Sequence, residues 1–549
     1  MIQPSVAPMR PAAEAERATP ETLAEAIDAL QSTERGFHFA HGSDDGAFAS
    51  HAALRLRARD MARRLLGAGC RPGDAVVLLT DSQADFVPLF LAAMRAGLIL
   101  VPRSPPMPGA EPEEFAAGLA RAASVAGSST VLMSAALERD LAPHLQDLRR
   151  VTPAELETAR PTGDLCRPRP GDTALVQFTS GSSGAAKAVA LSHRNLISNA
   201  RAIVAALALD PARDVGVSWL PLHHDMGLIG FLVTPVLIEG TNWYMSPRDF
   251  AARPQRWLDL ISRARATISF APTFGYDHAA RRIRSEDAGA WDFSNWRVAG
   301  CGGEPILPEP LNRFADLLAP AGFRRNAFTP CYGLAEATLA VTVPPLGRGL
   351  LVHDPAKGAG AKQTLVSCGL PVEGAEIRLT GPDGAVLAEG EEGEIEIRGP
   401  SVAASVRTDE GPDGSDRGAG WRATGDIGAV SGGELYVSGR LKEVIIHNGQ
   451  NLFPQEIEQA VRGFEGVARG NAVAFGRPSA RGEEIVLAVE AKPGIEAADL
   501  QRRLRERIRL SLGLSLADVV VVGRGCISRT TSGKLRRVEL RRRYLAGGL

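Results

Sequence analysis

Three lysines stand in motifs where a mobile positive charge could take part in chemistry. The chain has only six lysines among its 62 basic residues, and these three are Lys187 in TSGSSGAAK, Lys442 in SGRLKEV and Lys534 in TTSGKLRR. A lysine ammonium is a compact charge on a flexible stem, so it can follow a phosphate or carboxylate that moves during a reaction. The alternative is that codon bias makes lysine rare and that the few remaining lysines stand at random positions. The residues around each lysine must decide between the two.

A loop rich in serine and glycine precedes Lys187. It follows the apolar run from Ala174 to Phe178, which predicts a strand. Small residues let backbone N–H groups approach phosphate oxygens, and hydroxyls and an ammonium add further donors. The spacing of Gly181 and Gly184 differs from that of the GxxxxGK(S/T) phosphate loop. The loop is therefore either a solvated linker or a phosphate site of another kind.

Two histidines and an aspartate meet in SWLPLHHDMG, from Ser218 to Gly227. A zinc site would need a second cluster of histidine or cysteine, and the sequence offers none. We therefore expect a histidine that borders a substrate pocket at the end of a strand.

Two further motifs combine a glycine turn with an acid, as a nucleotide site requires. They are AGCGGEP at 299–305 and TPCYGLAE at 329–336. Tyr332 could stack on a purine, or it could be a core aromatic beside a turn. Asp426 in TGD and Arg440 at the end of ELYVSGR could both hold ribose hydroxyls, although either residue alone would be unremarkable.

The overall charge argues against nucleic acid or an anionic membrane as the partner. The chain has 62 basic and 63 acidic residues and a net charge of -1, so it carries no chain-wide field. Near the C-terminus arginine is frequent, at Arg536, Arg537, Arg541, Arg542 and Arg543. Such a run is usually a solvated face or a partner surface, and no aromatic platform accompanies it.

Cysteine spacing and hydropathy indicate a cytoplasmic protein. The six cysteines are scattered singly, which is typical of reduced thiols and predicts neither disulfides nor zinc. The most apolar stretch, Ala75 to Val101, is interrupted by Asp81, Asp85 and Arg95, so no membrane span is expected.

The elements that must position these motifs follow an α/β rhythm. Between 51 and 101 the pattern predicts helix His51–Ala68, strand Asp74–Thr80, helix Ala84–Ala96 and strand Leu98–Pro102. The same rhythm returns between Ala174 and Phe270, which predicts parallel α/β sheets.

Two later regions have different patterns. Residues 376–398 alternate short β-like runs with turns, which predicts a β subdomain with hairpins, and 408–420 is expected to be an exposed loop. After Leu441 the pattern indicates a small α+β domain. The expected fold class is α/β, with a large N-terminal domain of two α/β sheet subdomains plus a β subdomain, and a small mobile α+β C-terminal domain. The expected boundaries are 1–20 for a flexible tail, 21–440 for the large N-terminal domain and 441–549 for the small C-terminal domain.

These blocks, in this order, resemble the adenylate-forming superfamily of acyl-activating enzymes, over essentially the whole chain after residue 20. The segments SWLPLHHDMGLIG, CYGLAEATL, LVSCGLP and TTSGKLRR look most like the fatty acyl-AMP ligases. The resemblance implies activation of a hydrophobic carboxylic acid with ATP and Mg²⁺ to an acyl-adenylate, with release of pyrophosphate. The acyl group then passes to the phosphopantetheine thiol of an acyl carrier protein.

Two alternatives stay open. One is an acyl-CoA synthetase with the same first step, because the ligases carry an insertion that disfavours coenzyme A, and the matching stretch here, about Val341 to Thr364, is short. The other is a non-catalytic adenylate-binding protein, because Ala186 and Ala188 replace the proline and glycine that usually flank the loop lysine.

The resemblance also implies that 21–440 is the acyl- and ATP-binding domain and 441–549 a mobile lid domain, and it implies roles for individual residues. The phosphate loop would comprise Thr179, Ser180, Gly181, Ser182, Ser183, Gly184 and Lys187. The rest of the nucleotide site would comprise Gly302, Gly303, Glu304, Pro305, Tyr332, Gly333, Leu334, Ala335, Asp426 and Arg440, with Glu336 on Mg²⁺. Lys534 and His224 would be catalytic, Lys442 would be the hinge, and Trp219, His224, Phe231, Phe274 and Tyr276 would border the acyl tunnel.

Overall fold

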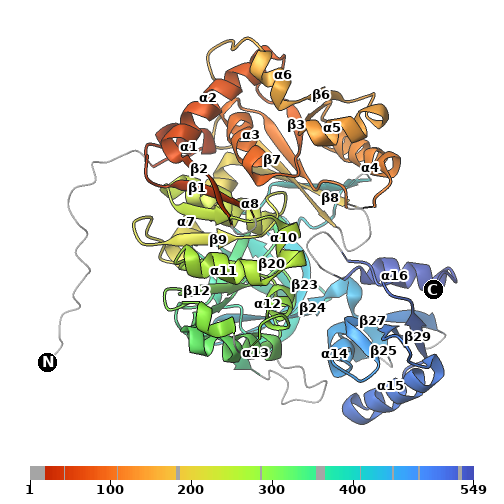
Figure 1. Cartoon of the computed structure of the whole chain (residues 1–549). Coiled ribbons are helices and arrows are strands. Elements are labelled where there is room, and N and C mark those ends of the chain that lie inside the picture. Colours follow the sequence, from red (N-terminus) through yellow and green to blue (C-terminus); the bar gives the residue numbers. More distant parts are fainter. Residues whose placement is uncertain are drawn as a thin grey trace.

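The large part of the molecule is built from two α/β layers, and a small α+β domain lies beside them (Figure 1). The computed structural model describes residues 19–41, 44–107, 109–180, 186–284, 287–353, 365–408, 410–447, 450–479, 482–529 and 535–549. The expected fold class is confirmed, because mixed α/β sheets form the large N-terminal part and a smaller domain follows it.

The first layer is an eight-stranded sheet in the order β22-β21-β8-β7-β4-β3-β5-β6. Its strands are β3 (Ala75–Leu79), β4 (Ile99–Arg103), β5 (Thr130–Met133), β6 (Arg149–Val151), β7 (Thr173–Ser180), β8 (Ala186–Ser192), β21 (Ser405–Thr408) and β22 (Gly411–Pro412). The central parallel strands are buried on both faces, which explains the continuous apolar run of β3. Helices α2 (His51–Gly67) and α3 (Gln83–Arg95) pack on one face, and α4 (Pro112–Val125) and α5 (Ala135–Leu141) pack on the other.

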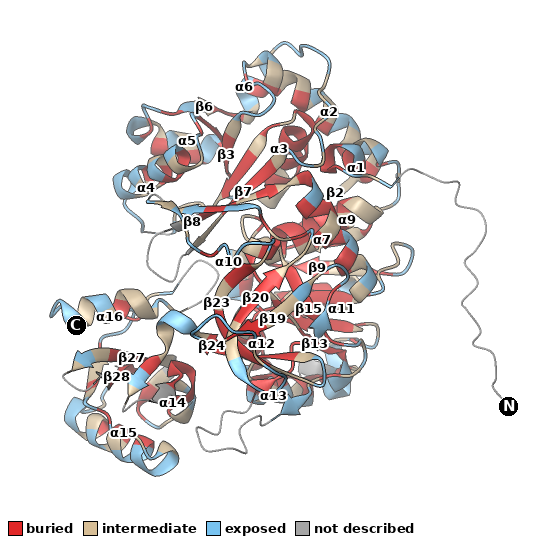
Figure 2. Ribbon diagram, turned by 180° about the vertical axis from the view of Figure 1, so that it is seen from behind, coloured by how far each residue is buried: buried red, intermediate tan, exposed pale blue. Residues whose placement is uncertain are grey.

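The second layer is a seven-stranded sheet in the order β13-β12-β11-β9-β10-β1-β2. Its strands are β1 (Gly36–His41), β2 (Asp44–Ser50), β9 (Val215–Ser218), β10 (Thr241–Tyr244), β11 (Ile268–Ala271), β12 (Val298–Cys301) and β13 (Phe328–Pro330). All neighbours pair in parallel except the β1–β2 hairpin, which the sequence patterns did not predict. Its helices include α7 (His193–Ala206), α9 (Thr234–Ile238), α11 (Gln255–Arg263), α12 (Thr273–Ala280) and α13 (Pro308–Leu318). Figure 2 shows these strands buried beneath helices that are partly exposed.

The parallel strands of this second sheet end at a common edge. The segments that follow β9, β11, β12 and β13 begin with Trp219, Pro272, Gly302 and Cys331. In open α/β sheets, ligands bind in the crevice outside the carboxyl ends of the strands. The register of the sheet therefore brings together three motifs that are far apart in the sequence.

The β subdomain and the small domain complete the fold. The former is the antiparallel sheet β19 (Glu376–Thr380), β20 (Glu392–Arg398), β23 (Arg422–Ser431) and β24 (Glu434–Arg440). The latter contains β27 (Val467–Ser479), β28 (Gly482–Ala491) and β29 (Asp518–Val522), with α14 (Pro454–Ala460), α15 (Ala497–Leu512) and α16 (Arg537–Leu545). The small domain has its own apolar clusters on both faces of its sheet, which is typical of a separate folding unit.

The segment at 408–420 differs in part from the expectation. Much of it is exposed, but Asp413 and Ser415 turn inward, and the Asp413 side chain is only 3% exposed. The strands β21 and β22 hold this segment, because β21 pairs with β8 of the first sheet. The many glycines and charged residues of 408–420 gave no indication that the Asp413 carboxylate is buried.

Candidate active site

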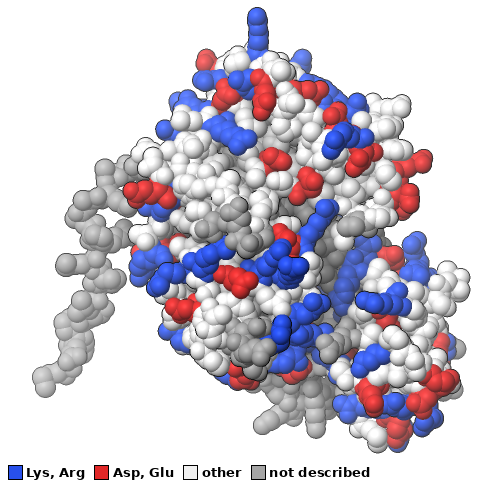
Figure 3. Space-filling model, viewed as in Figure 1, with Lys and Arg blue, Asp and Glu red and all other residues white. Residues whose placement is uncertain are grey.

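A single cavity of about 1470 Å³ lies between the large part and the small domain. Residues of both sheets, the β subdomain and the small domain line it. Figure 3 shows lysine and arginine side chains on both sides of the hollow between the two parts. The cavity has a charged region and an apolar region.

Lys187 is the central cation of the charged region. It lies on β8, directly across from Thr179 on β7. Its Nζ is 2.8 Å from Asp413 Oδ2 and 3.8 Å from Glu336 Oε1. The sheet therefore holds one ammonium between two carboxylates from distant parts of the chain.

Asp413 is held by further donors. Its Oδ1 accepts hydrogen bonds from the backbone N–H and the hydroxyl of Ser415, at 3.1 and 2.6 Å, and lies 3.6 Å from Arg422 Nη1. Burial alone would raise the pKa of Asp413, but the hydrogen bonds from Lys187 and Ser415 outweigh it and lower the pKa. The Asp413 side chain is therefore a fixed anion.

Glu336 is the second carboxylate beside Lys187. Burial raises its pKa, while Lys187 and Arg440 oppose the rise. A buried carboxylate with a raised pKa gains by meeting an additional cation.

Tyr332, Asp426 and Arg440 form a second cluster. The Tyr332 hydroxyl donates to Asp426 Oδ2 at 2.8 Å, and Arg440 Nε lies 3.0 Å from Asp426 Oδ1. Asp426 and Arg440 are directly paired across β23 and β24, so the sheet register fixes this ion pair. The Asp426 charge raises the pKa of Arg440, and burial raises the pKa of Tyr332.

The glycine turn after β12 lets the backbone of Gly302 and Gly303 approach the cavity closely. A Cβ atom at Gly302 would lie 2.8 Å from the Cys331 carbonyl oxygen, and Gly303 has a φ of +77°. Both positions therefore favour glycine. Glu304 Oε1 accepts a hydrogen bond of 2.6 Å from the Phe274 N–H, which fixes the turn against α12.

The two histidines of HHDMG have different environments. His224 Nδ1 lies 2.8 Å from Asp225 Oδ1, and the imidazole lines the cavity. His223 is more enclosed, and burial together with the nearby His224 lowers its pKa to about 3. His223 is therefore neutral at physiological pH.

The apolar region extends from the carboxyl end of β9 towards its amino end. Trp219, Phe231 and Phe274 line it, and Trp219 stacks on Phe250 with ring centroids 3.8 Å apart. Trp219 lies five positions after Asp214, with the four residues of β9 between them, a distance of roughly 16 Å. Both of these residues line the cavity, so the apolar region is deep.

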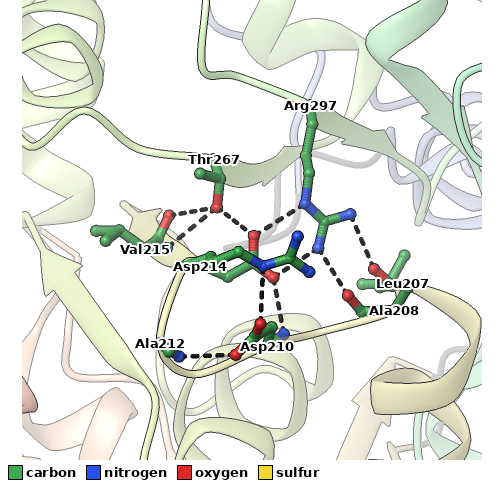
Figure 4. A network of polar contacts seen from close by, with 9 residues as sticks. Leu207, Ala208, Asp210, Ala212, Asp214, Val215, Thr267 and Arg297 are labelled. Atoms are coloured by element: carbon green, nitrogen blue, oxygen red, sulfur yellow. Dashed lines mark hydrogen bonds and ion pairs between the residues drawn. The ribbon is translucent and has the colours of Figure 1, made fainter. Parts of the chain in front are cut away.

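A polar network surrounds Asp214, which lines this part of the cavity at the amino end of β9 (Figure 4). Asp214 Oδ1 accepts hydrogen bonds from Thr267 and from Arg297 Nε at 2.8 and 2.9 Å, and Asp214 Oδ2 accepts one from Arg297 Nη2 at 2.7 Å. Arg297 also donates to the Leu207 and Ala208 carbonyls at the end of α7. Hydrogen bonds from Arg297 and from the Thr267 hydroxyl outweigh burial and lower the pKa of Asp214. The network therefore keeps its carboxylate charged and has a structural role.

The expectation for Tyr276 is wrong. Its side chain is fully buried in the aromatic core between α12 and α13, against Trp257, Phe314 and Phe328. Its hydroxyl donates to the Gly300 carbonyl at 2.8 Å. Tyr276 lies two residues after Phe274 on a helix, so its side chain points to another face.

The small domain contributes its own charged residues to the cavity. Arg537 contacts Glu443 Oε2 at 3.0 Å and Glu458 Oε2 at 2.8 Å, and these two carboxylates outweigh burial and raise its pKa. Arg529 and Leu535 pair as an antiparallel bridge and both line the cavity.

Two sequence-family matches cover most of the chain. Residues 29–405 match the family described as AMP-binding enzyme, and residues 449–542 match the AMP-binding enzyme C-terminal domain. The chain belongs to the AMP-binding enzyme family. Members of this family use ATP, and the chain is an adenylate-forming ligase, as the resemblance implied.

Relatives of this AMP-binding enzyme match along nearly its whole length. A Caulobacter vibrioides protein named as an acyl-CoA synthetase is 35% identical over 96% of both chains. The 4-hydroxyphenylalkanoate adenylyltransferase of Mycobacterium marinum is 34% identical over 90% of this chain and 85% of its own length. A structure from work on fatty acyl-adenylate ligases of E. coli and L. pneumophila has a TM-score of 0.90 at 33% identity, covering 96% of this chain and 98% of that chain.

The structure brings most of the expected site residues of this AMP-binding enzyme to one cavity. Those that line it are Thr179, Lys187, Trp219, His224, Phe231, Phe274, Gly302, Gly303, Glu304, Pro305, Tyr332, Gly333, Leu334, Ala335, Glu336, Asp426, Arg440 and Lys442. Gly181, Ser182, Ser183, Gly184 and Lys534 lie outside the described residues, as does the side chain of Ser180. Their assigned roles remain predictions.

Sequence reasoning missed Asp413 as a site residue. It stands in EGPDGSD, where neighbouring glycines and acids gave no signal of burial. Among the described residues there is no group of three or more histidine, cysteine or acidic side chains arranged for a metal. Within the same described part of the chain, no helix is long and apolar enough to cross a membrane.

Proposed function

We propose that this enzyme joins a hydrophobic carboxylic acid to AMP and then passes the acyl group to the phosphopantetheine thiol of an acyl carrier protein. The observation that carries this proposal is the continuity of the cavity, in which a deep apolar region opens onto a cluster of paired charges. A molecule that fills both regions has an apolar tail and a charged, nucleotide-like head.

The charged region is suited to a triphosphate. Lys187 can donate to phosphate oxygens, and its contacts with Asp413 and Glu336 hold the ammonium in place before the nucleotide enters. Thr179 and the loop from Ser180 to Gly184 would add hydroxyl and backbone donors.

Glu336 would hold Mg²⁺. Protein sites for this ion commonly supply one or two carboxylates and leave the remaining positions to substrate phosphates and water. The buried Glu336 carboxylate fits that pattern. Bound there, Mg²⁺ would neutralise phosphate charge.

The nucleoside would occupy the neighbouring positions. We assign the adenine to the turn Gly302–Pro305, to the Tyr332 ring and to the backbone from Gly333 to Ala335. Asp426 and Arg440 would hold the ribose, because each carboxylate oxygen of Asp426 can accept more than one hydrogen bond. The Tyr332–Asp426 hydrogen bond would couple the base and ribose positions.

The chemical step is an in-line displacement. A carboxylate oxygen of the acid attacks the α-phosphorus, the bond from that phosphorus to the bridging oxygen breaks, and pyrophosphate leaves. His224 would stand where the carboxyl group meets the nucleotide, and Trp219 and Phe274 would border the first part of the tail, since all three line the cavity. Lys534 would stabilise the charge on the α-phosphate and the attacking carboxylate.

The placement of Arg529 and Leu535 supports this role for Lys534. They flank the segment that contains Lys534, and both line the cavity. Arg537 with Glu443 and Glu458 would hold the start of α16 in position. We place the domain boundary after Arg440, where β24 ends, and the hinge at Lys442.

In the second step the carrier thiol attacks the acyl carbonyl carbon, loses its proton, and AMP leaves with the electrons of the anhydride bond. Rotation of the small domain about Lys442 would open the path for the thiol. The sequence resemblance to fatty acyl-AMP ligases, which implies transfer to a carrier protein, favours a carrier as acceptor. The relative named as an acyl-CoA synthetase supports coenzyme A as the second candidate acceptor.

The proposal is tested with purified protein, ATP, Mg²⁺ and a panel of hydrophobic acids, followed by either coenzyme A or a phosphopantetheinylated carrier protein. We expect acyl-adenylate by mass spectrometry, and acyl transfer to the carrier. Transfer to coenzyme A alone would identify a synthetase. ATP binding without adenylate from any acid would contradict the ligase proposal.

A further inference from the structure

The deep part of the tunnel contains a buried amide whose oxygen has no hydrogen-bond partner among the described residues. Asn242 lies in the middle of β10, and its residue surface is 0% exposed. Its Oδ1 makes no hydrogen bond to any residue that the structure describes, whereas its Nδ2 has the Tyr244 hydroxyl oxygen as a polar neighbour. Buried polar groups are nearly always paired, so an unpaired amide oxygen in a strand interior calls for an explanation.

The position of Asn242 places this amide beside the acyl tail. The residue lines the cavity, and it is paired with Gly216 of β9, which lines the cavity as well. Gly216 stands two residues before the carboxyl end of β9, so the amide lies about 7 Å deeper than the strand ends that carry the reaction site. Phe231 and Ile268 line the same part of the tunnel.

Gly216 makes room for the amide. A Cβ atom at Gly216 would lie 2.3 Å from Asn242 Oδ1, which is closer than atoms can approach. Glycine and asparagine are both depleted in strand interiors. Two unfavourable strand residues thus face each other at one point of the tunnel, where a pair of apolar β-branched residues would stabilise the sheet.

The neighbouring hydroxyl leaves an acceptor open. The Tyr244 hydroxyl donates its proton to the Phe231 carbonyl. Burial raises the pKa of Tyr244, and a hydrogen bond from the Asn242 amide N–H opposes this rise, so Oδ1 is the amide atom that lacks a partner. Asn242 Oδ1 has no donor among the described residues, and the group that completes it must bring an N–H or O–H.

The polar network around Asp214 provides the contrast (Figure 4). Its carboxylate, guanidinium and hydroxyl groups bond to one another and to backbone carbonyls, as expected of a structural element. Asn242 differs, because it has a buried polar atom that no described residue pairs, and it lines the cavity. The same is true of Gln177, Trp219 and His223.

We infer that Asn242 selects an acid that bears a hydroxyl group partway along its apolar tail, with the hydroxyl donating to Asn242 Oδ1. This inference rests on the proposed adenylation function and deepens it. The substrate class is a hydroxylated hydrophobic acid, either a hydroxyaryl alkanoate or an aliphatic hydroxy acid. A plain fatty acid would leave the amide oxygen unpaired in the complex as well.

The test compares matched pairs of acids by ATP–pyrophosphate exchange. One pair is 3-(4-hydroxyphenyl)propanoate with 3-phenylpropanoate, and a series of straight-chain acids with and without a hydroxyl at successive positions forms the other arm. We expect the wild-type kcat/KM to favour the hydroxylated member of at least one pair by about tenfold or more. The arm that shows the preference identifies the aryl or aliphatic source.

Asn242→Leu removes the amide but keeps the branching and the number of side-chain heavy atoms. This variant should lose the preference for the hydroxyl while keeping exchange with the plain acid, and its melting temperature should equal or exceed that of the wild type. Ile268→Val, which changes the same wall without a polar group, should keep the preference. A preference that survives in Asn242→Leu, or that is absent from the wild type with active acids, would overturn the inference.

Failure of the adenylation proposal can be distinguished from failure of the inference about Asn242. If no acid supports exchange, the adenylation proposal fails. Calorimetric binding of the same acids then decides the tunnel assignment, because wild-type protein should still bind the hydroxylated member more tightly than Asn242→Leu does. Equal binding by the two proteins would overturn it.

Discussion

The two regions of the cavity treat buried polar groups in opposite ways. In the charged region, Lys187, Asp413 and Arg422 form a chain of ion pairs from three separate segments. In the tunnel, the Asn242 Oδ1 and the Trp219 indole N–H have no hydrogen-bonding partner among the described residues. The first arrangement holds charges ready for a reaction common to the family, and the second leaves groups open for a particular substrate.

This difference separates chemistry from selectivity. Preorganised charges stabilise a transition state because they do not need to reorient during the reaction. Unpaired groups in an otherwise apolar tunnel discriminate between substrates, because a tail that cannot pair them binds less well. Changes at the charged region should therefore affect all acids alike, and changes in the tunnel should alter the ranking of acids.

Lys187→Met gives the largest expected effect. The variant removes the ammonium that would contact the phosphates, so adenylation of every acid should fall by about 10²–10³-fold. Pyrophosphate exchange measures the loss. Lys492→Met, at an exposed position of the small domain, is the matched control. A loss restricted to certain acids would contradict the division between the two regions.

Asp413→Asn should affect both rate and stability. It removes the negative charge between Lys187 and Arg422, and breaking a buried ion pair typically costs about 3–5 kcal/mol. We expect a loss of about 2–4 kcal/mol in denaturant unfolding, since the amide keeps part of the hydrogen bonding. Asp416→Asn, at an exposed position of the same loop, should change little. Wild-type stability in Asp413→Asn would show that the pair is not structural.

Gly216→Ala narrows the tunnel. The added methyl would meet Asn242 Oδ1 at 2.3 Å, so the amide must move towards the tail. KM for acids that reach this depth should rise by about tenfold, with kcat for short acids unchanged. Gly230→Ala is the control, because its Cβ would lie no closer than 3.6 Å to Leu339. Equal effects on short and long acids would place the tail elsewhere.

Glu456→Gln should give the smallest effect, at the contact between the domains. Burial, with the charge of Glu392 on the β subdomain, raises the pKa of Glu456 to about 7, above its ordinary value of 4.5. The folded protein therefore binds this proton more tightly than the unfolded chain, and stability falls as pH rises from 4.5 to 7.

The variant should remove this dependence. We expect on the order of 1–2 kcal/mol less change in unfolding free energy between pH 5 and pH 8 than in the wild type, measured by urea denaturation. Glu465→Gln, at an exposed position of the small domain, should keep the wild-type dependence. An unchanged pH profile in Glu456→Gln would show that another group is responsible.

Much of the fold was predictable because long periodic segments dominate it. The α2, β3, α3 and β4 units end within one or two residues of the expected positions. The β1–β2 hairpin was not predicted, since its residues alternate weakly and its partner strand β10 lies some 200 residues away in the sequence.

The site was predictable to a similar extent and for a related reason. Motif residues such as Lys187, Tyr332 and Asp426 have distinctive neighbours, and sheet register brings them together. Tyr276 was misassigned because adjacency to Phe274 does not determine helix face. Asp413 and Asn242 have ordinary sequence surroundings, and only burial and missing or completed hydrogen bonds distinguish them.

The most direct test of the account is a crystal structure with a stable acyl-adenylate analogue, in which a sulfamoyl group replaces the phosphate. The account predicts the nucleoside against Tyr332 and Asp426, and the acyl tail running past Trp219 towards Asn242. A tail that lies outside this tunnel, or a nucleoside away from the Asp426–Arg440 pair, would contradict it.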